Sequence, residues 1–154
     1  VVTGFEADRI NVALAGLPIQ FVRNADYEAG QQFSVRAGLL EAPDAQHHLI
    51  GLGDQPQLTA DDLRALIAAH LAADVQKISI PFQDSTRGNP IVVPCAMRAR
   101  LLVNQANPGC GNFTRANPEL AQHIPMPQPG FFNDIDTPAA FTAFEQMTSQ
   151  RAMT

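Results

Sequence analysis

The stretch Leu49–His70, LIGLGDQPQLTADDLRALIAAH, predicts a strand that gives way to a helix. Its opening apolar run is typical of a buried strand, and Pro56 ends that run because proline cannot donate a ladder hydrogen bond. Thr59, followed three residues later by Asp62, is typical of a capping-box helix start with Asp in place of the usual Glu. Asp54 therefore lies at the carboxyl end of the predicted strand, the edge of an open α/β sheet where ligands bind.

Outside this stretch the chain continues to alternate predicted strands and helices. Strands are expected at 1–4, 19–22, 49–52, 77–82, 90–93 and 122–125, and helices through 10–14, 31–43, 61–73, 96–105, 113–120 and 137–147. This alternation predicts an α/β fold, a doubly wound, mostly parallel sheet with helices on both faces. Because no linker or repeat interrupts it, residues 1–154 are expected to form a single domain.

The composition of the chain argues against nucleic acid and membrane partners. A chain of 154 residues with 45% hydrophobic residues can bury one core. The net charge is -5 and Lys77 is the only lysine, so no basic stripe is available to follow a nucleic acid backbone. No apolar run approaches the roughly 20 residues needed to span a bilayer, and the start lacks the features of a signal peptide. We therefore expect a cytoplasmic protein without nucleic acid or membrane partners.

Three carboxylates are candidate metal ligands. Near the carboxyl end, the sequence NDIDTP places Asp134 and Asp136 two residues apart, on one face of an extended segment. Converging with Asp54, they would form the incomplete oxygen coordination that Mg²⁺ needs when it also binds nucleotide phosphates. The alternatives are local backbone hydrogen bonding by Asp54 and helix capping by Asp134 or Asp136. Which of these two is the second metal ligand stays open.

Two further segments could bind anions. Residues 30–36, GQQFSVR, lead from a glycine turn into a helix whose amino terminus could present N–H groups to phosphate; the alternative is an ordinary surface helix. Residues 87–90, RGNP, form a turn in which glycine permits close approach of a ligand and Arg87 could pair with phosphate; the alternative is an ordinary turn.

Other chemistries lack their sequence patterns. Cys95 and Cys110 are too few for a disulfide framework or a zinc site, and we expect them to be buried or half-buried thiols. The four histidines have no metal-ligand spacing, and His70 is expected to pack on an apolar helix face. The phosphate-loop, dinucleotide-binding and nucleophile-elbow motifs are also absent.

Taken together, five segments resemble one enzyme family in order and spacing. They are VVTGFEADRI, FVRNADYEAGQQFSVRAGL, LIGLGDQPQLT, RGNPIVVP and DIDTPAAF. They look like the molybdenum cofactor cytidylyltransferase group of nucleotidyltransferases, whose superfamily also holds molybdopterin guanine dinucleotide synthase. The resemblance covers nearly the whole chain and implies a Rossmann-like nucleotidyltransferase fold.

The resemblance also implies roles for individual residues. Catalytic and metal-binding roles fall on Asp54 and Asp136, nucleotide binding on Gly30, Ser34, Arg36 and Gly53, and acceptor binding on Arg87, Gly88, Asn89 and Pro90. Asn89 stands where the family usually has His, and GQQFS differs from its commoner G-M-x-S-S.

One family segment is missing from this sequence. The resemblance implies an earlier strand and a Gly-rich triphosphate loop, so we expect a domain truncated at its amino terminus, with an exposed sheet edge through which copies could associate. The implied reaction transfers CMP, or another NMP, from an NTP, preferably CTP, to a phosphorylated acceptor such as molybdopterin. It releases pyrophosphate and requires Mg²⁺. The alternative is a non-catalytic nucleotide- or partner-binding domain that has lost the triphosphate loop; the base and the acceptor stay open.

Overall fold

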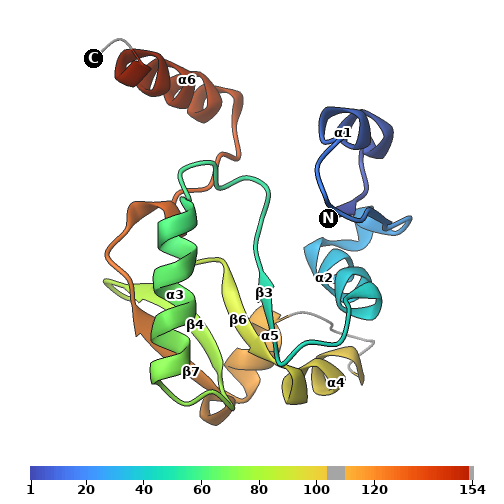
Figure 1. Cartoon of the computed structure of the whole chain (residues 1–154), viewed down its shortest axis with the longest axis vertical. Helices are drawn as coiled ribbons and strands as arrows, with labels where there is room; N and C mark the ends of the chain where they lie inside the picture. The colour runs from blue at the N-terminus through green and yellow to red at the C-terminus, as the bar shows by residue number, and fades with distance from the viewer. Residues whose placement is uncertain (104–109, 153–154) are drawn as a thin grey trace.

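A sheet with helices on both faces forms the body of the molecule (Figure 1). The computed structural model describes residues 1–103 and 110–152. The main sheet has the order β3 (His47–Ile50), β6 (Ile91–Pro94), β4 (Ile78–Gln83) and β7 (Ala121–Pro125), with the short β5 (Thr86–Arg87) also paired to β4. A separate parallel pair consists of β1 (Val2–Thr3) and β2 (Val22–Arg23).

The helices occur near their expected positions. They are α1 (Ala7–Ala13), α2 (Gln31–Glu41), α3 (Ala60–Ala72), α4 (Cys95–Val103), α5 (Cys110–Ala116) and α6 (Pro138–Ala152), with 3-10 turns at Tyr27–Ala29, Pro118–Leu120 and Pro129–Phe131. The expected end of the α4 helix, residues 104 and 105, lies outside the described residues. Figure 1 shows α6 beyond the end of the sheet, on the side from which the loop after β3 rises.

Alternating side chains of the central strands build a core on each face of the sheet. On β4, Ile78 and Ile80 join the cluster that contains Leu39 of α2 and Met97 of α4. Val92 of β6 joins the opposite cluster, with Leu66 of α3, Ile124 of β7 and Phe131. A period of two along each strand places successive residues on opposite faces. The α/β class, the helices on both faces and the Rossmann-like architecture are thereby confirmed.

The sheet differs from the expectation in the direction of one central strand. β6 runs antiparallel to both of its neighbours, whereas β3, β4 and β7 run in one direction. The cause is the short connection from β4 to β6, because a parallel crossover needs about a dozen residues or more. Within that connection, β5 pairs with β4 in a hairpin whose turn residues Asp84 and Ser85 have φ values of 47° and 68°.

The strand before Asp54 is shifted relative to its predicted bounds. Pairing with β6 extends from His47 opposite Pro94 to Ile50 opposite Ile91, so β3 begins and ends earlier than the apolar run suggested. Asp54 consequently lies in the loop beyond the strand end. The helix start is as predicted: the N–H of Thr59 donates to Asp62 Oδ2 at 2.9 Å, and the N–H of Asp62 donates to Thr59 Oγ1 at 3.2 Å.

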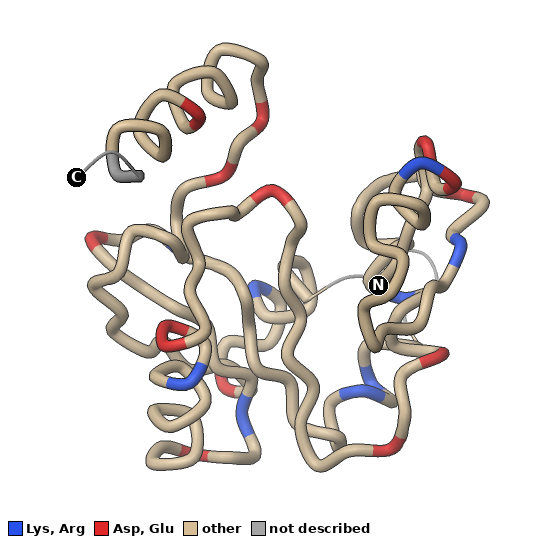
Figure 2. The backbone as a smooth tube through the Cα atoms, turned by 45° about the horizontal axis from the view of Figure 1, so that its top comes forward, with Lys and Arg blue, Asp and Glu red and all other residues tan. Residues whose placement is uncertain are grey.

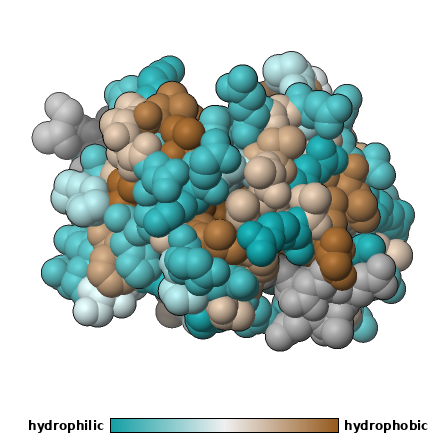
Figure 3. Space-filling view, turned by 90° about the horizontal axis from the view of Figure 1, so that it is seen from below, coloured by the Kyte–Doolittle hydropathy of each residue, from teal (hydrophilic) through white to brown (hydrophobic). Residues whose placement is uncertain are grey.

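Some backbone and apolar surface is left uncovered. In the described part of the chain, β3 pairs only with β6, so its other edge has no strand partner. Phe5, Val12 and Val103 are strongly exposed, yet on the face shown in Figure 3 the apolar groups are separated by hydrophilic ones. Self-association through the sheet edge stays a prediction. None of the described helices combines the length and apolar character required to cross a membrane.

His70 is packed in the sheet-facing side of α3, as predicted. Its side chain is 1% exposed, and Nδ1 lies 2.7 Å from the hydroxyl oxygen of Ser79 on β4. The amide of Gln122 also donates to that hydroxyl, at 2.9 Å, while the ring of His47 meets His70 edge-on at 4.7 Å. Burial, and then the charge of His47, lower the pKa of His70 below its ordinary value of 6.5.

We expect this histidine to make the fold sensitive to mild acid. Since the unfolded chain binds the proton more readily, the contribution of neutral His70 to stability is present above its unfolded pKa and is lost as pH falls below it. Urea unfolding of the wild type and of His70→Gln, at about pH 7.5 and about pH 5.5, measures the effect. The wild type should lose more of its unfolding free energy between the two pH values; equal losses would contradict the account.

Candidate functional site

An acidic cluster forms where two distant segments meet beyond the end of β3. Asp54 lies in the loop after β3, and Asp134 and Asp136 lie in the segment that leads into α6. The N–H of Ile135 donates to the backbone carbonyl of Asp54 at 2.8 Å, which holds the two segments together. Figure 2 shows acidic positions in both segments at this end of the sheet.

The carboxylate of Asp54 lies in an environment that favours a bound cation. Its Oδ1 is buried without a hydrogen-bond partner among the described residues. The pKa of this carboxyl is raised, above all by burial; a backbone hydrogen bond opposes the shift, and the charges of Asp134 and then Asp136 add to it. A buried oxygen next to like charges is costly for the protein alone, and a cation would offset that cost.

The described residues supply only part of the coordination shell of a metal ion. Among them, no group of three or more His, Cys, Asp or Glu side chains is arranged to hold a metal ion by itself. Asp136 accepts no hydrogen bond from the described residues, and the hydroxyl of Thr137 accepts the Ala140 N–H in the first turn of α6 at 3.2 Å, so the oxygens of Asp136 are available. Mg²⁺ commonly uses one or two carboxylates and completes its shell with water and phosphate oxygens. The acidic cluster fits that pattern of binding.

Gln55 positions the acidic cluster, and the sequence analysis did not identify it. Its side chain is 5% exposed, and Nε2 donates to Asp134 Oδ1 at 2.8 Å and to the carbonyl of Phe131 at 3.1 Å. These partners are 79 and 76 residues away in sequence, so no local pattern indicates them. One carboxylate of the cluster is thus oriented by a buried amide.

The carbonyl of Phe131 also fixes the loop at residues 87–90. It accepts the backbone N–H of Asn89 at 2.9 Å, and the N–H of Gly88 donates to the Pro81 carbonyl at 2.8 Å. A Cβ at Gly88 would lie 2.6 Å from the Phe131 carbonyl oxygen, so this close approach requires glycine. The loop with the expected acceptor-binding residues is therefore tied to the same segment as the acidic cluster.

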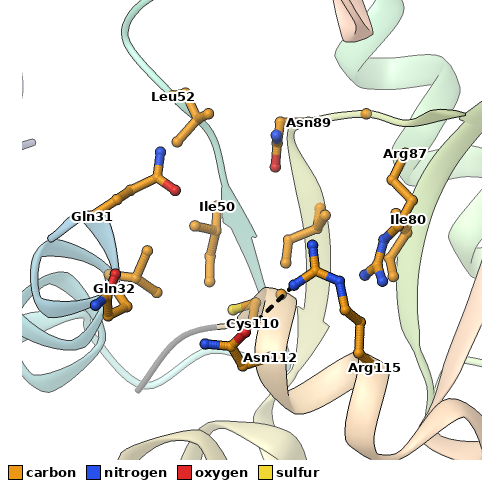
Figure 4. Close-up of a pocket in the computed structure, with 14 residues that line it drawn as sticks. Gln31, Gln32, Ile50, Leu52, Ile80, Arg87, Asn89, Cys110, Asn112 and Arg115 are labelled. Atoms are coloured by element: carbon orange, nitrogen blue, oxygen red, sulfur yellow. Dashed lines mark hydrogen bonds between the residues drawn. The ribbon is translucent and has the colours of Figure 1, made fainter. Parts of the chain in front are cut away.

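A cavity of about 350 Å³, here called the arginine cavity, opens beside this loop (Figure 4). Arg87, Gly88 and Asn89 line it, whereas Pro90 is buried and does not. Cys110 lines it as well, but burial raises the pKa of that thiol to about 11. The thiol is therefore protonated near neutral pH, in agreement with the expectation that it is a buried cysteine. Cys95 is exposed, so the same expectation is wrong for that residue.

Arg115 is a second cation in the arginine cavity that the sequence analysis missed. It comes from α5 and donates to Asn112 Oδ1 at 3.4 Å, whereas Arg87 comes from β5 and donates to the hydroxyl of Thr114. Burial, and then the positive charge of Arg115, lower the pKa of Arg87. Figure 4 shows the two guanidinium groups side by side at one wall of the cavity.

The residues expected to bind the nucleotide do not form one group. Ser34 and Gly53 line a larger cavity of about 750 Å³ between α2, β3 and the β1–β2 pair. Gly30 caps the amino terminus of α2 with φ of 119°, and Arg36 lines neither cavity. The two cavities adjoin, because both are lined by Gln31, Val35, Ile50 and Leu52.

Comparison with known proteins gives a family match, and a curated relative is among the similar proteins. The family model described as MobA-like NTP transferase domain matches residues 1–122. Nicotine blue oxidoreductase of Paenarthrobacter nicotinovorans is 26% identical over 142 residues, which cover 89% of this chain and 70% of that protein.

Solved structures share the fold. A nucleotidyl transferase from Methanothermobacter matches with a TM-score of 0.75 and 19% identity, over 98% of this chain and 73% of its own. Rv0371c of Mycobacterium tuberculosis, solved as a manganese complex, matches with a TM-score of 0.69 and 21% identity, over 92% of this chain and 74% of its own. The resemblance found in the sequence is thus confirmed, and the chain belongs to the family of MobA-like NTP transferase domains.

Proposed function

We propose that this protein transfers a nucleotidyl group from an NTP to a phosphorylated small-molecule acceptor and releases pyrophosphate. CTP is the expected donor, which makes CMP the transferred group, and molybdopterin is the example of an acceptor that the resemblance implies. The main support is the hydrogen-bonded link, through Phe131, between the acidic cluster and the loop that carries Arg87. A nucleotidyltransferase needs these two kinds of charge close together, acidic oxygens for a cation and arginine for phosphate.

We assign a divalent cation, expected to be Mg²⁺, to Asp54 and Asp136, with Asp134 as the other candidate for the second ligand. The manganese complex of the mycobacterial neighbour supports a divalent ion. When bound, such an ion would neutralise phosphate charge and align the two substrates.

The chain's own residues would act by positioning. The acceptor phosphate oxygen attacks the α-phosphorus of the NTP; one P–O bond forms there, and the bond from that phosphorus to the pyrophosphate oxygen breaks. No protein nucleophile is required. We propose nucleotide contacts at Gly30, Ser34, Arg36 and Gly53, and acceptor contacts at Arg87, Gly88, Asn89 and Pro90. Ser34 and Gly53 gain support from the larger cavity, and Arg36 rests on the resemblance alone.

A non-catalytic binding domain is the alternative. The curated relative is named as an oxidoreductase, so family membership alone does not fix the reaction. The single-domain organisation and the cytoplasmic location stay predictions.

The first prediction from the proposed function concerns turnover itself. With Mg²⁺ and a phosphorylated acceptor, we expect pyrophosphate release from CTP to exceed release from GTP, and EDTA to stop it because the acidic cluster then lacks its cation. A coupled pyrophosphate assay measures both effects. Binding of a nucleotide without any turnover would favour the non-catalytic alternative.

The second prediction separates the function of Asp54 from its effect on stability. Asp54→Asn should lower turnover by at least about a hundredfold. Removing a group that only hydrogen-bonds to a metal ligand already costs about ten- to a hundredfold in activity, and removing the ligand itself should cost at least as much. The substitution should also raise the urea midpoint near neutral pH without metal. The midpoint should rise because the raised pKa of Asp54 means that its charged carboxylate is disfavoured in the folded state near neutral pH, and Asn carries no charge.

Added Mg²⁺ should raise the melting temperature of the wild type but not that of Asp54→Asn, since only the former would hold the ion. Asp8→Asn is the matched control, because it removes an exposed acid on α1 that lies outside the cluster. If Asp54→Asn and Asp8→Asn behaved alike in activity and in the metal-dependent shift, the assignment of Asp54 would be wrong.

The third prediction concerns Gln55. Gln55→Leu should weaken metal-dependent activity by about ten- to a hundredfold, because Asp134 loses the amide that orients it. The variant should need more Mg²⁺ for half-maximal rate, and circular dichroism should show that its fold is kept. Gln76→Leu, at an exposed glutamine before β4, serves as the control. An unchanged Mg²⁺ dependence would show that Gln55 has only a packing role.

A further inference from the structure

The arginine cavity contains more positive charge than its walls neutralise. Arg87 from β5 and Arg115 from α5 both face it, and the described residues that line it include no Asp or Glu. Among the described residues, neither arginine forms an ion pair, whereas Arg9, Arg64 and Arg98 each do. Two neighbouring cations repel each other, and a bound anion is the usual means of stabilising such a pair.

The first of the two guanidinium groups is held in place. Arg87 is half-buried and donates to the hydroxyl of Thr114, which is itself 3% exposed and donates to the Cys110 carbonyl at 2.8 Å. One side of the Arg87 guanidinium is thereby anchored to α5. Its pKa is lowered by burial and by Arg115, which agrees with two cations facing a shared space.

Neutral hydrogen-bonding groups and apolar side chains complete the wall. Amides come from α2, from the loop at 87–90 and from α5, and the apolar floor comes from β3, the loop after it and β4. The residues are Gln31, Asn89, Asn112, Ile50, Leu52 and Ile80. Small-molecule sites commonly combine a few fixed polar groups with an apolar lining in about 300–1,000 Å³. The arginine cavity has this character.

We propose that the arginine cavity binds the phosphate monoester of the acceptor between Arg87 and Arg115, with the remainder of the acceptor on the apolar floor. This rests on the proposed function and deepens it, since it adds Arg115 as a substrate-binding residue. A phosphate monoester is close to dianionic near neutral pH, so it matches two guanidinium groups in charge. A guanidinium also binds phosphate oxygens in a two-pronged manner that lysine cannot reproduce.

The test uses inorganic phosphate as the probe and needs no catalytic activity. Phosphate is titrated into the intact chain in EDTA, and NMR follows the arginine Nε–H signals and the side-chain amides of Asn89 and Asn112. We expect saturable shifts at Arg87, Arg115 and these amides. They should persist in Asp54→Asn, because the site does not depend on the acidic cluster.

Variants with equal charge changes separate a specific site from general electrostatics. Arg115→Gln should raise the dissociation constant for phosphate by about tenfold or more, as expected for loss of a charge-assisted pair, and Arg115→Lys should restore part of the affinity. Arg64→Gln is the matched control, since Arg64 lies on α3 and pairs with Asp61. If Arg115→Gln and Arg64→Gln weakened phosphate equally, or if no shifts occurred at Arg115, the proposal would be overturned.

A competition arm identifies which phosphate the cavity receives. With Mg²⁺ present, CTP should leave phosphate bound at Arg87 and Arg115, because the nucleotide uses the acidic cluster. Displacement of phosphate from both arginines by CTP would assign the cavity to the nucleotide and overturn the acceptor assignment.

The proposed function can fail without affecting this result. If phosphate binds but no nucleotidyl transfer occurs, the Arg115-dependent phosphate site stands and the protein has another function. The assignment of that phosphate to an acceptor would then be wrong. Where transfer is observed, Arg115→Gln should raise KM for the acceptor and leave KM for CTP unchanged. The reverse pattern would overturn the proposal.

Discussion

The carbonyl oxygen of Phe131 is the point on which the organisation of the site depends. It accepts one hydrogen bond from the backbone of Asn89 and another from the side chain of Gln55. The same Gln55 amide orients Asp134. Because Phe131 is fully buried in the core beneath α3, the acceptor is held rigidly. One buried carbonyl thus links the arginine-bearing loop to the acidic cluster, and losing either hydrogen bond would break that link.

The sheet brings these loops to one place. β3, β4 and β7 run in one direction, and the loop after β3 carries Asp54. Because β6 is antiparallel to β4, the connection between them is short and contains the β4–β5 hairpin. Arg87 of β5 therefore lies across the arginine cavity from α2. α3 covers the opposite face, with His70 bonded to Ser79, and its core cluster supports Phe131. The arginine cavity thus lies on the α2 face of the strands, while the cluster that contains Phe131 lies on the α3 face.

The local features of this chain were predictable, and its long-range contacts were not. Thr59 and Asp62 form the expected capping box because both partners lie within one turn. The bounds of β3 shifted because pairing with β6, and not the apolar run, fixes where a strand ends. The sequence pattern predicted that Asp134 and Asp136 converge with Asp54, which agrees with the influence of both charges on the pKa of Asp54. Gln55 and Arg115 escaped notice because their roles arise only when segments far apart in sequence meet.

Paramagnetic broadening by Mn²⁺ tests the central claim most directly, namely that a divalent cation binds where the loop after β3 meets the segment before α6. Mn²⁺ is titrated into the ¹⁵N-labelled chain, and the amide signals are followed with the Asp54→Asn variant alongside. Broadening should be strongest at Asp54, Gln55 and Ile135, should extend to Asn89, and should be lost in the variant. Broadening centred elsewhere, for instance at His47 and His48, or unaffected by Asp54→Asn, would contradict the account.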